Sequence, residues 1–216
     1  MKKNNKHINE SSSSTQTAFG GQVEPLVMPL AGTMGRIKFS RIWAMPNKWT
    51  FTIIPIKQLL TKYEVGENWI DPFAGENSPA EITNDIRLES NAKYHLDAKE
   101  FLTLIGKETY GGGLFDPPYS QNQVDFSYKG NGSNLYQRNT EATKHLFAIK
   151  RKFARLIKPG GISISFGWNS MGMGLKLGFA IEEIMLVPHG RMANDTIVTV
   201  ERKMQAGLFD GREQEV

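Results

Sequence analysis

The chain has 216 residues, of which 39% are hydrophobic and none is cysteine, and its formal net charge is +4. This length and composition predict one globular domain with a substantial core. The lack of cysteine excludes disulfides, thiolate nucleophiles and cysteine-ligated zinc, and the four histidines show no metal-ligand spacing, so no metal site is expected. No apolar run approaches the roughly 18 residues of a membrane span, and no apolar signal segment follows Met1, so we expect a cytoplasmic protein.

Residues 1–35 have no hydrophobic period and include a serine-rich run, which predicts a disordered amino-terminal arm. Residues 37–43 then alternate apolar and polar, like a strand or an extended segment. Pro55 begins a predicted helix with apolar residues at helical spacing, which ends before Gly66. The segment ahead of this helix contains Trp49, Thr50 and Phe51.

A buried strand, 69–71, runs into the loop Asp71-Pro72-Phe73-Ala74-Gly75, where glycine permits a close approach between backbone and ligand. The next predicted strand, 81–85, follows after only about ten residues, whereas a parallel crossover normally takes a dozen or more, including a helix. The first crossover helix is therefore expected to be one turn or absent.

Two acidic residues follow the predicted strands of this half of the sheet. Asp85 ends the second strand, where an acidic side chain suits ribose hydroxyls or begins a turn. A third strand is predicted over 93–97. Asp97, at its end, is placed to cap a helix predicted over 98–105.

The run 111–115 ends in Asp116-Pro117-Pro118-Tyr119. Prolines cannot donate to a sheet ladder, so the strand stops and leaves a carboxylate, a stiff backbone and an aromatic ring at its carboxyl end. Open α/β sheets bind ligands there. Asp116 and the carbonyl of Pro117 could each accept a hydrogen bond from the exocyclic amine of a flipped base, with Tyr119 stacked on it. The alternative is a strand-ending turn capped by Asp116.

Asp-Pro-Pro-Tyr resembles the catalytic motif of S-adenosylmethionine-dependent amino-methyltransferases, above all the DNA adenine-N6 enzymes, and Asp-Pro-Phe-Ala-Gly resembles their cofactor loop. The resemblance covers about residues 43–202 and implies S-adenosylmethionine as cofactor and DNA as substrate. It implies that the catalytic residues are Asp116, Pro117, Pro118 and Tyr119. It implies that the cofactor-binding residues are Trp49, Thr50, Phe51, Asp71, Phe73, Ala74, Gly75, Asp85 and Asp97.

Residues 121–140 are polar and have no period, and loops of this length are commonly functional or disordered. Aromatic rings interleaved with cations beside the catalytic motif suit a splayed nucleotide and its phosphates, whereas a lid without substrate contacts is the alternative. The residues expected to contact nucleic acid are Tyr128, Lys129, Tyr136, Arg138 and, after the fifth strand, Trp168, which could instead cap the core.

The remaining pattern predicts a closing sheet and a tail. A helix over 141–157 is followed by the turn Pro159-Gly160-Gly161 and a strand over 162–166. Two further strands, 178–187 and 193–201, form a hairpin. The expected fold is α/β, with a Rossmann-like, seven-stranded methyltransferase sheet that is mostly parallel and closes in an antiparallel hairpin.

This fold is expected to occupy residues 36–202, with a flexible tail over 203–216 in which Gln205–Phe209 resembles the peptide that docks on bacterial sliding clamps. We therefore expect a DNA adenine-N6 methyltransferase. One alternative is an RNA base-amine methyltransferase, because ribosomal and transfer-RNA enzymes share the tetrapeptide. The other is a non-catalytic methyltransferase-like subunit that binds nucleic acid. Without a recognition domain after the core, target choice is expected from 121–140, from the arm or from a partner.

Overall fold

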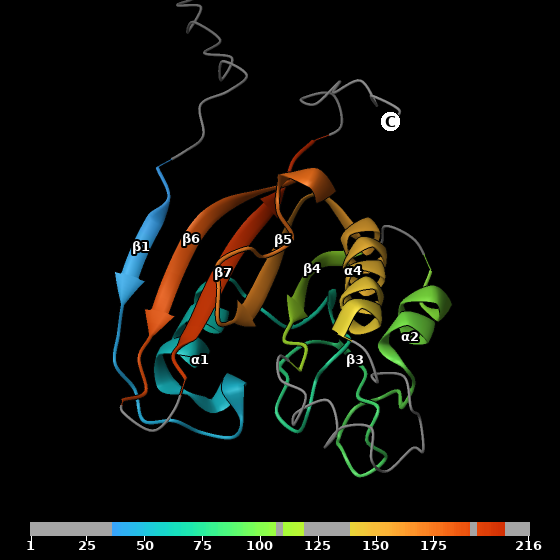
Figure 1. The fold of residues 1–216 in the computed structure, drawn as a ribbon, viewed down its shortest axis with the longest axis horizontal. Coiled ribbons are helices and arrows are strands. Elements are labelled where there is room, and N and C mark those ends of the chain that lie inside the picture. The colour runs from blue at the N-terminus through green and yellow to red at the C-terminus, as the bar shows by residue number, and fades with distance from the viewer. Residues whose placement is uncertain (1–35, 107–109, 119–138, 191–193, 206–216) are drawn as a thin grey trace, which may run out of the picture. The chain divides into compact units, whose positions relative to one another are not determined.

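The computed structural model describes residues 36–106, 110–118, 139–190 and 194–205 (Figure 1). Within these residues, seven strands form one mixed sheet in the order β1-β6-β7-β5-β4-β2-β3. The strands are β1 Lys38–Arg41, β2 Trp69–Asp71, β3 Ile82–Thr83, β4 Tyr110–Phe115, β5 Ile157–Gly167, β6 Phe179–Val187 and β7 Thr196–Lys203. The helices are α1 Ile54–Lys62, α2 Ala98–Leu104 and α4 Asn139–Leu156, with short 3₁₀ turns η1 Thr50–Thr52 and η2 Leu175–Leu177.

All neighbouring strands are parallel except at β7, which lies antiparallel between β5 and β6. This order and the antiparallel closing pair are those of the methyltransferase sheet, and they confirm the predicted fold class. Residues 72–81, between β2 and β3, contain no helix, as the short spacing predicts. No helix in the described part of the chain is long and apolar enough to cross a membrane.

The set of seven strands differs from the predicted one at both edges of the sheet. The strand predicted over 93–97 is reduced to a single bridge between Tyr94 and Asn84. The seventh place is taken by β1, which pairs in parallel with β6 at the opposite edge. The predicted turn at Pro159-Gly160-Gly161 lies inside β5 as an irregularity, since β4 residues Tyr110 and Gly112 pair with Ile157 and Ile162.

Two hydrophobic clusters cover the two faces of the sheet. One contains Ile56, Leu59 and Leu60 of α1, and the other contains residues of α2 and α4. The glycines of β4 explain how both clusters approach the sheet so closely. A Cβ at Gly112 would lie 2.6 Å from the indole of Trp69, and one at Gly113 would lie 2.5 Å from the ring of Phe153. Because neighbouring residues of a strand face opposite sides, each glycine admits one large ring.

Candidate active site

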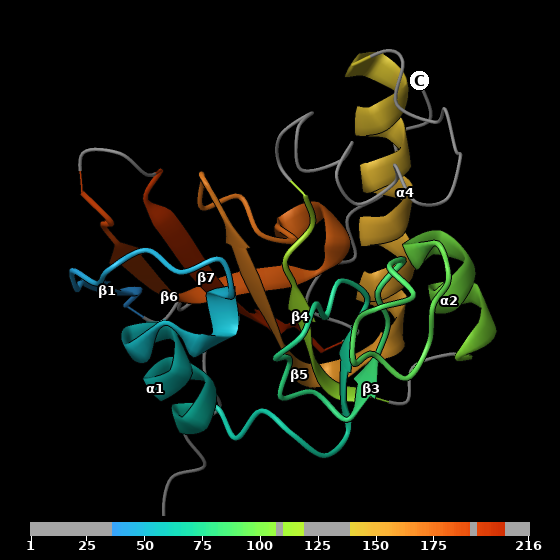
Figure 2. The same ribbon diagram turned by 90° about the horizontal axis from the view of Figure 1, so that it is seen from below.

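The predicted catalytic and cofactor segments meet where parallel strands end. Asp71 is the last residue of β2, and Asp116 directly follows β4, the neighbouring parallel strand. Thr50, at the start of η1, hydrogen-bonds through its side chain to Asp116. Figure 2, seen from below, faces the ends to which the arrowheads of β4, β5 and β6 point in Figure 1. Residues that are distant in the sequence thus lie together at the carboxyl ends of the parallel strands.

Asp71 is a fully buried carboxylate. Its Oδ1 accepts a hydrogen bond from the backbone N–H of Phe73 at 2.9 Å, and its Oδ2 accepts one from the hydroxyl of Ser78 at 2.6 Å. Burial raises the pKa of Asp71 to about 7, and the carboxylates of Asp116 and Asp85 add to this rise, although the two hydrogen bonds oppose it. A substantial fraction of Asp71 is therefore neutral at pH 7.

Asp116 also has a raised pKa. Burial raises the pKa of Asp116 to about 6, and the hydrogen bond with Thr50 opposes the rise because it favours the ionised form. Once Asp116 is charged, its field holds the proton on Asp71. Burial thus raises the pKa of both carboxyl groups, and the Thr50 hydroxyl favours the ionised form of Asp116, which is the form that only accepts hydrogen bonds.

The loop after Asp71 is shaped by its backbone rather than by a helix. Gly75 has φ of +56°, in the left-handed region that favours glycine. Its N–H donates to Oδ2 of Asp85 at 2.9 Å, and the N–H of Ala74 donates to the carbonyl of Asn84 at 2.8 Å. These bonds fix residues 72–75 against the end of β3.

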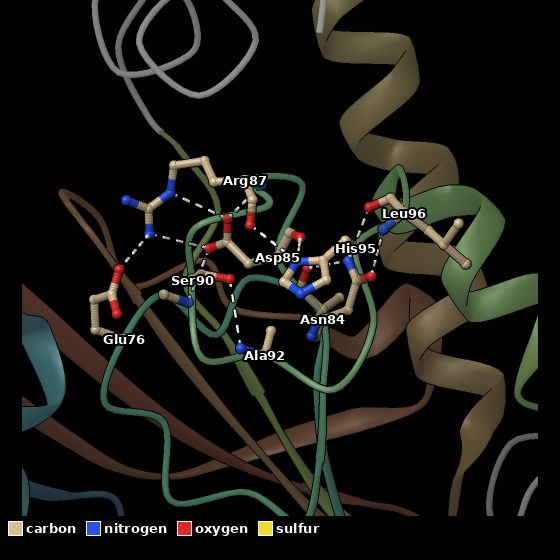
Figure 3. A network of polar contacts seen from close by, with 10 residues as sticks. Glu76, Asn84, Asp85, Arg87, Ser90, Ala92, His95 and Leu96 are labelled. Atoms are coloured by element: carbon tan, nitrogen blue, oxygen red, sulfur yellow. Dashed lines mark hydrogen bonds and ion pairs between the residues drawn. The ribbon is translucent and has the colours of Figure 1, made fainter. Parts of the chain in front are cut away.

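Figure 3 shows that the carboxylate of Asp85 is surrounded by donors of its own chain. Besides Gly75, it accepts hydrogen bonds from the backbone N–H of Arg87 at 2.9 Å and from Nε of Arg87 at 3.1 Å. Nη2 of Arg87 lies 3.9 Å from the carboxylate of Glu76. A carboxylate offers about four lone-pair positions. Nη2 of Arg87 supplies a fourth bond, to Oδ2 of Asp85 at 3.5 Å, so a ligand hydroxyl that binds Asp85 must displace the guanidinium of Arg87.

His95 supports the same turn. Its Nδ1 lies 2.9 Å from the carbonyl oxygen of Arg87 and 3.2 Å from that of Asp85. Both neighbours can only accept, so Nδ1 carries the hydrogen. His95 therefore does more than occupy a position in the predicted 93–97 strand, because it closes the 85–87 turn.

Asn84 is a structural residue of the site that the sequence did not single out. It is 1% exposed, and its side-chain amide donates to the carbonyls of Pro72 at 3.2 Å and Leu96 at 3.0 Å. Its Oδ1 accepts from the N–H of Leu96 at 3.0 Å. The side chain of Asn84 therefore joins the loop 72–75 to the segment before α2. The signal in the sequence was an Asn at the end of a predicted buried strand.

Asp97 caps α2 as predicted, because its Oδ1 accepts from the N–H of Lys99 at 2.8 Å. Its Oδ2 lies 3.4 Å from Nε2 of His145 on α4.

The other predicted residues differ in their exposure and surroundings. Phe51 and Ala74 are buried, and the ring of Phe51 packs 5.4 Å from that of Phe166, which gives Phe51 a place in the core. Phe73 packs 5.4 Å from Phe115, while Trp49 is partly exposed beside Thr50. Trp168 follows β5 and is 48% exposed. The predicted residues outside the described part of the chain are Tyr119, Tyr128, Lys129, Tyr136, Arg138 and most of Gln205–Phe209.

The residues present fit S-adenosylmethionine at the loop and, after a side-chain movement, at Asp85. The left-handed Gly75 leaves open space, since a Cβ there would meet only Nη2 of Arg87, at 3.8 Å. Within the part of the chain that the structure describes, no group of three or more acidic or histidine side chains could hold a metal ion.

No family model matches the chain, and no curated protein matches it. Solved structures similar to it include a 1,6-didemethyltoxoflavin-N1-methyltransferase from Burkholderia thailandensis, with TM-score 0.47, 13% identity, and coverage of 69% of this chain and 76% of that one. TrmN from Thermus thermophilus has TM-score 0.45, 16% identity, and coverage of 70% and 49%. PH0851 has TM-score 0.42, 16% identity, and coverage of 64% and 43%.

The chain thus spans less than half the length of TrmN and of PH0851. At these TM-scores and identities the similarity assigns no activity, substrate or residue role to this chain. What the structure shows is the fold. The strand order of this chain is that of the S-adenosylmethionine-dependent methyltransferase fold.

Proposed function

We propose that this protein is an S-adenosylmethionine-dependent methyltransferase that acts on the exocyclic N6 amine of adenine in DNA. The observation that carries the proposal is the meeting of Asp71, from the cofactor-like loop, with Asp116, from Asp-Pro-Pro-Tyr, at the ends of neighbouring strands. Cofactor and base must lie side by side for in-line transfer. The two motifs that resemble their binding segments are adjacent in space.

Asp116 and the backbone of Pro117 act on the amine. The nitrogen lone pair of adenine's amine is delocalised into the ring, so two acceptors that bind its hydrogens favour a geometry in which the lone pair is free to attack. The carboxylate of Asp116 is one acceptor and the carbonyl of Pro117 is the other. Thr50 orients Asp116 and keeps it ionised, which is electrostatic preorganisation of the kind that contributes most to catalysis. The cofactor, when bound, supplies the electrophilic sulfonium methyl group.

Binding of the cofactor falls to the loop 72–75 and to the acidic residues behind it. The left-handed Gly75 allows a close approach of ligand to backbone. Asp85 and Asp97 would hold the ribose and the adenine of the cofactor, respectively. For Asp85 this requires the Arg87 side chain to leave its carboxylate, whereas the bond from Gly75 can remain.

The test is nucleoside mass spectrometry on DNA and on RNA after incubation with the full chain and isotope-labelled S-adenosylmethionine. Labelled N6-methyladenine in DNA, lost in Asp116→Ala with a normal thermal melt, is the expected result. Removal of a charge-assisted acceptor costs about 1.5–3 kcal/mol in binding, and more where it acts in the transition state. Label found only in RNA would show that the substrate is RNA and not DNA. Cofactor binding without label in either would favour the non-catalytic subunit.

A further inference from the structure

We propose that residues 36–49, named here the basic–aromatic strip, bind the DNA that flanks the target base. The inference rests on the proposed function and adds a substrate surface outside the catalytic motif. The strip comprises β1 and the segment that leads from β1 to η1, and Figures 1 and 2 show it running from the edge of the sheet toward α1.

Large apolar side chains of the strip are exposed to an extent that packing does not explain. Phe39 is 68% exposed, Trp43 is 60% exposed and Met45 is 69% exposed. Contiguous exposed apolar residues mark interaction sites in proteins that stay soluble. Flat aromatic rings are also the side chains on which unpaired bases stack.

The charge of the strip has one sign. No Asp or Glu occurs from Arg36 to Tyr63, whereas Arg36, Arg41 and Lys48 are exposed. Nζ of Lys48 lies 4.5 Å from the ring centroid of Trp49, so a cation and an aromatic face are presented together.

Lys38 belongs to the strip but is partly neutralised from the neighbouring strand. It pairs in register with Glu183 of β6, and its charge lowers the pKa of that carboxyl group, though less than the hydrogen bonds from Lys62 and Tyr63 do. The argument for a polyanionic ligand therefore rests on the three other cations.

The strip is fixed in place and leads directly into the site. The N–H of Ile42 donates to the carbonyl of Leu186 at 3.0 Å, and that of Ala44 donates to the carbonyl of Pro188 at 3.2 Å. Nδ1 of His189 lies 3.0 Å from the carbonyl of Ala44. The strip then ends one residue before Thr50, which contacts Asp116. The chain of the strip thus leads directly to the residue that contacts Asp116.

Charge complementarity selects DNA over a second copy of this chain. Two copies joined through the edges of β1 would bring the exposed cations Arg36 and Arg41 near those of the other copy, and such like-charge contacts are costly. A duplex supplies regularly spaced phosphates for the cations, and a duplex opened at the target base also supplies unstacked faces for Trp43 and Phe39.

The first test is the salt dependence of DNA binding by the full chain with the variant Arg41→Ala/Lys48→Ala. The matched control, Lys158→Ala/Lys176→Ala, removes the same charge from exposed positions at the start of β5 and in η2. Each lost phosphate contact lowers the slope of log K against log salt by about 0.9. We expect a slope reduced by about 1.8 and a raised KM for DNA, with kcat unchanged. A response equal to that of the control would overturn the inference.

The second test addresses the aromatic part. Trp43→Ala should weaken binding to an oligonucleotide duplex with an unpaired target base by about tenfold, the lower part of the range for one stacked base. Trp43→Phe should retain most of the affinity. If Trp43→Ala binds this duplex as tightly as the parent does, Trp43 does not stack on a base. A parent protein that binds no DNA would overturn both this inference and the DNA substrate, whereas a parent that methylates DNA while all variants bind normally would overturn this inference alone.

Discussion

Burial and one hydrogen bond act on Asp116 in opposite directions, and the outcome is a pKa of about 6. The protonated acid is a weaker acceptor for the substrate amine than the ionised form. Below pH 6 the fraction of active enzyme should fall accordingly. The residue that opposes the rise, Thr50, comes from a segment 66 positions earlier in the chain, so the fold sets the state of the carboxylate.

We predict that Thr50→Val moves the acidic limb of the pH profile of kcat/KM to higher pH. The limb should lie near pH 6 in the parent, because this profile reports the free enzyme's essential groups. The hydroxyl stabilises the ionised form, so its loss raises the pKa of Asp116. Thr50→Ser keeps the hydroxyl and should keep the limb. If the acidic limb does not move in Thr50→Val, the ionisation that it reports is not that of Asp116.

Asp71 makes a second residue-scale prediction, about stability. The pKa of Asp71 is about 7 in the folded protein against an ordinary value of 3.8, so the folded state binds a proton that the unfolded state releases. This group therefore contributes less stability as pH rises from about 4 to about 7, by up to about 4 kcal/mol at about 1.36 kcal/mol per unit.

Asp71→Asn should remove that loss while keeping an acceptor for Phe73 and a partner for Ser78. The unfolding free energy of the variant should therefore increase relative to that of the parent as pH rises from about 4 to about 7. Urea denaturation at several pH values measures this difference. Glu89→Gln, at an exposed position, serves as the control and should show little change. A pH-independent difference for Asp71→Asn would contradict the prediction.

At the scale of elements, the crossover between β2 and β3 replaces a helix with side-chain hydrogen bonds. Asp71 holds the start and middle of the crossover, Asp85 holds Gly75, and Asn84 joins Pro72 to Leu96. Backbone groups of the crossover, such as the N–H of Phe73 and of Gly75, are thus paired by side chains.

Asn84→Ala should therefore be strongly destabilising, by about 3 kcal/mol or more. The substitution leaves the carbonyls of Pro72 and Leu96 and the N–H of Leu96 without these partners, and each unsatisfied buried group costs about 1–3 kcal/mol. The midpoint of urea denaturation measures the change. Asn91→Ala, at an exposed position, is the control. A loss no larger than that of the control would show that the amide contributes little to holding the crossover.

The sequence predicted those features of the molecule that depend on local pattern. The strands predicted over 178–187 and 193–201 correspond to β6 and β7, and Asp97 marks the start of α2. The short spacing after Asp71 predicted a crossover helix of one turn or none, and the structure has none. Each of these is decided by residues within one segment. The order of these elements along the chain also indicated the class of sheet, because few topologies satisfy that order.

The pairing of strands and the partners of individual side chains could not be predicted from local sequence patterns. The 93–97 strand is cut short because the N–H and carbonyl of Leu96 bond the amide of Asn84 rather than a β3 backbone. Residues 37–43 indicated a strand, but its neighbour β6 lies far along the chain. The contact of Thr50 with Asp116 likewise joins residues that are distant in the sequence.

At the scale of the whole molecule, a buried polar cluster joins α4 to the sheet away from Asp116. Glu201 of β7 is fully buried and accepts hydrogen bonds from the N–H groups of Met173 at 2.5 Å and Gly174 at 2.8 Å. Lys150 of α4 donates to the carbonyl of Gly172. Burial raises the pKa of Glu201 and lowers that of Lys150, while each charge partly offsets the shift of the other.

We predict that this cluster governs global stability without governing chemistry. Glu201→Gln should destabilise by about 1–3 kcal/mol, because it leaves one buried N–H without an acceptor and the partly buried Lys150 without a counter-charge. Lys150→Met combined with Glu201→Gln should cost less than the sum of the single changes, since the second change removes the uncompensated charge. Urea denaturation of the four proteins gives the coupling. Below the unfolding transition, kcat should match the parent, because Glu201 pairs in register with Ser163 and not with the strand end at Asp116. Additive costs would mean that the two charges do not interact, and a lowered kcat would tie the cluster to the site.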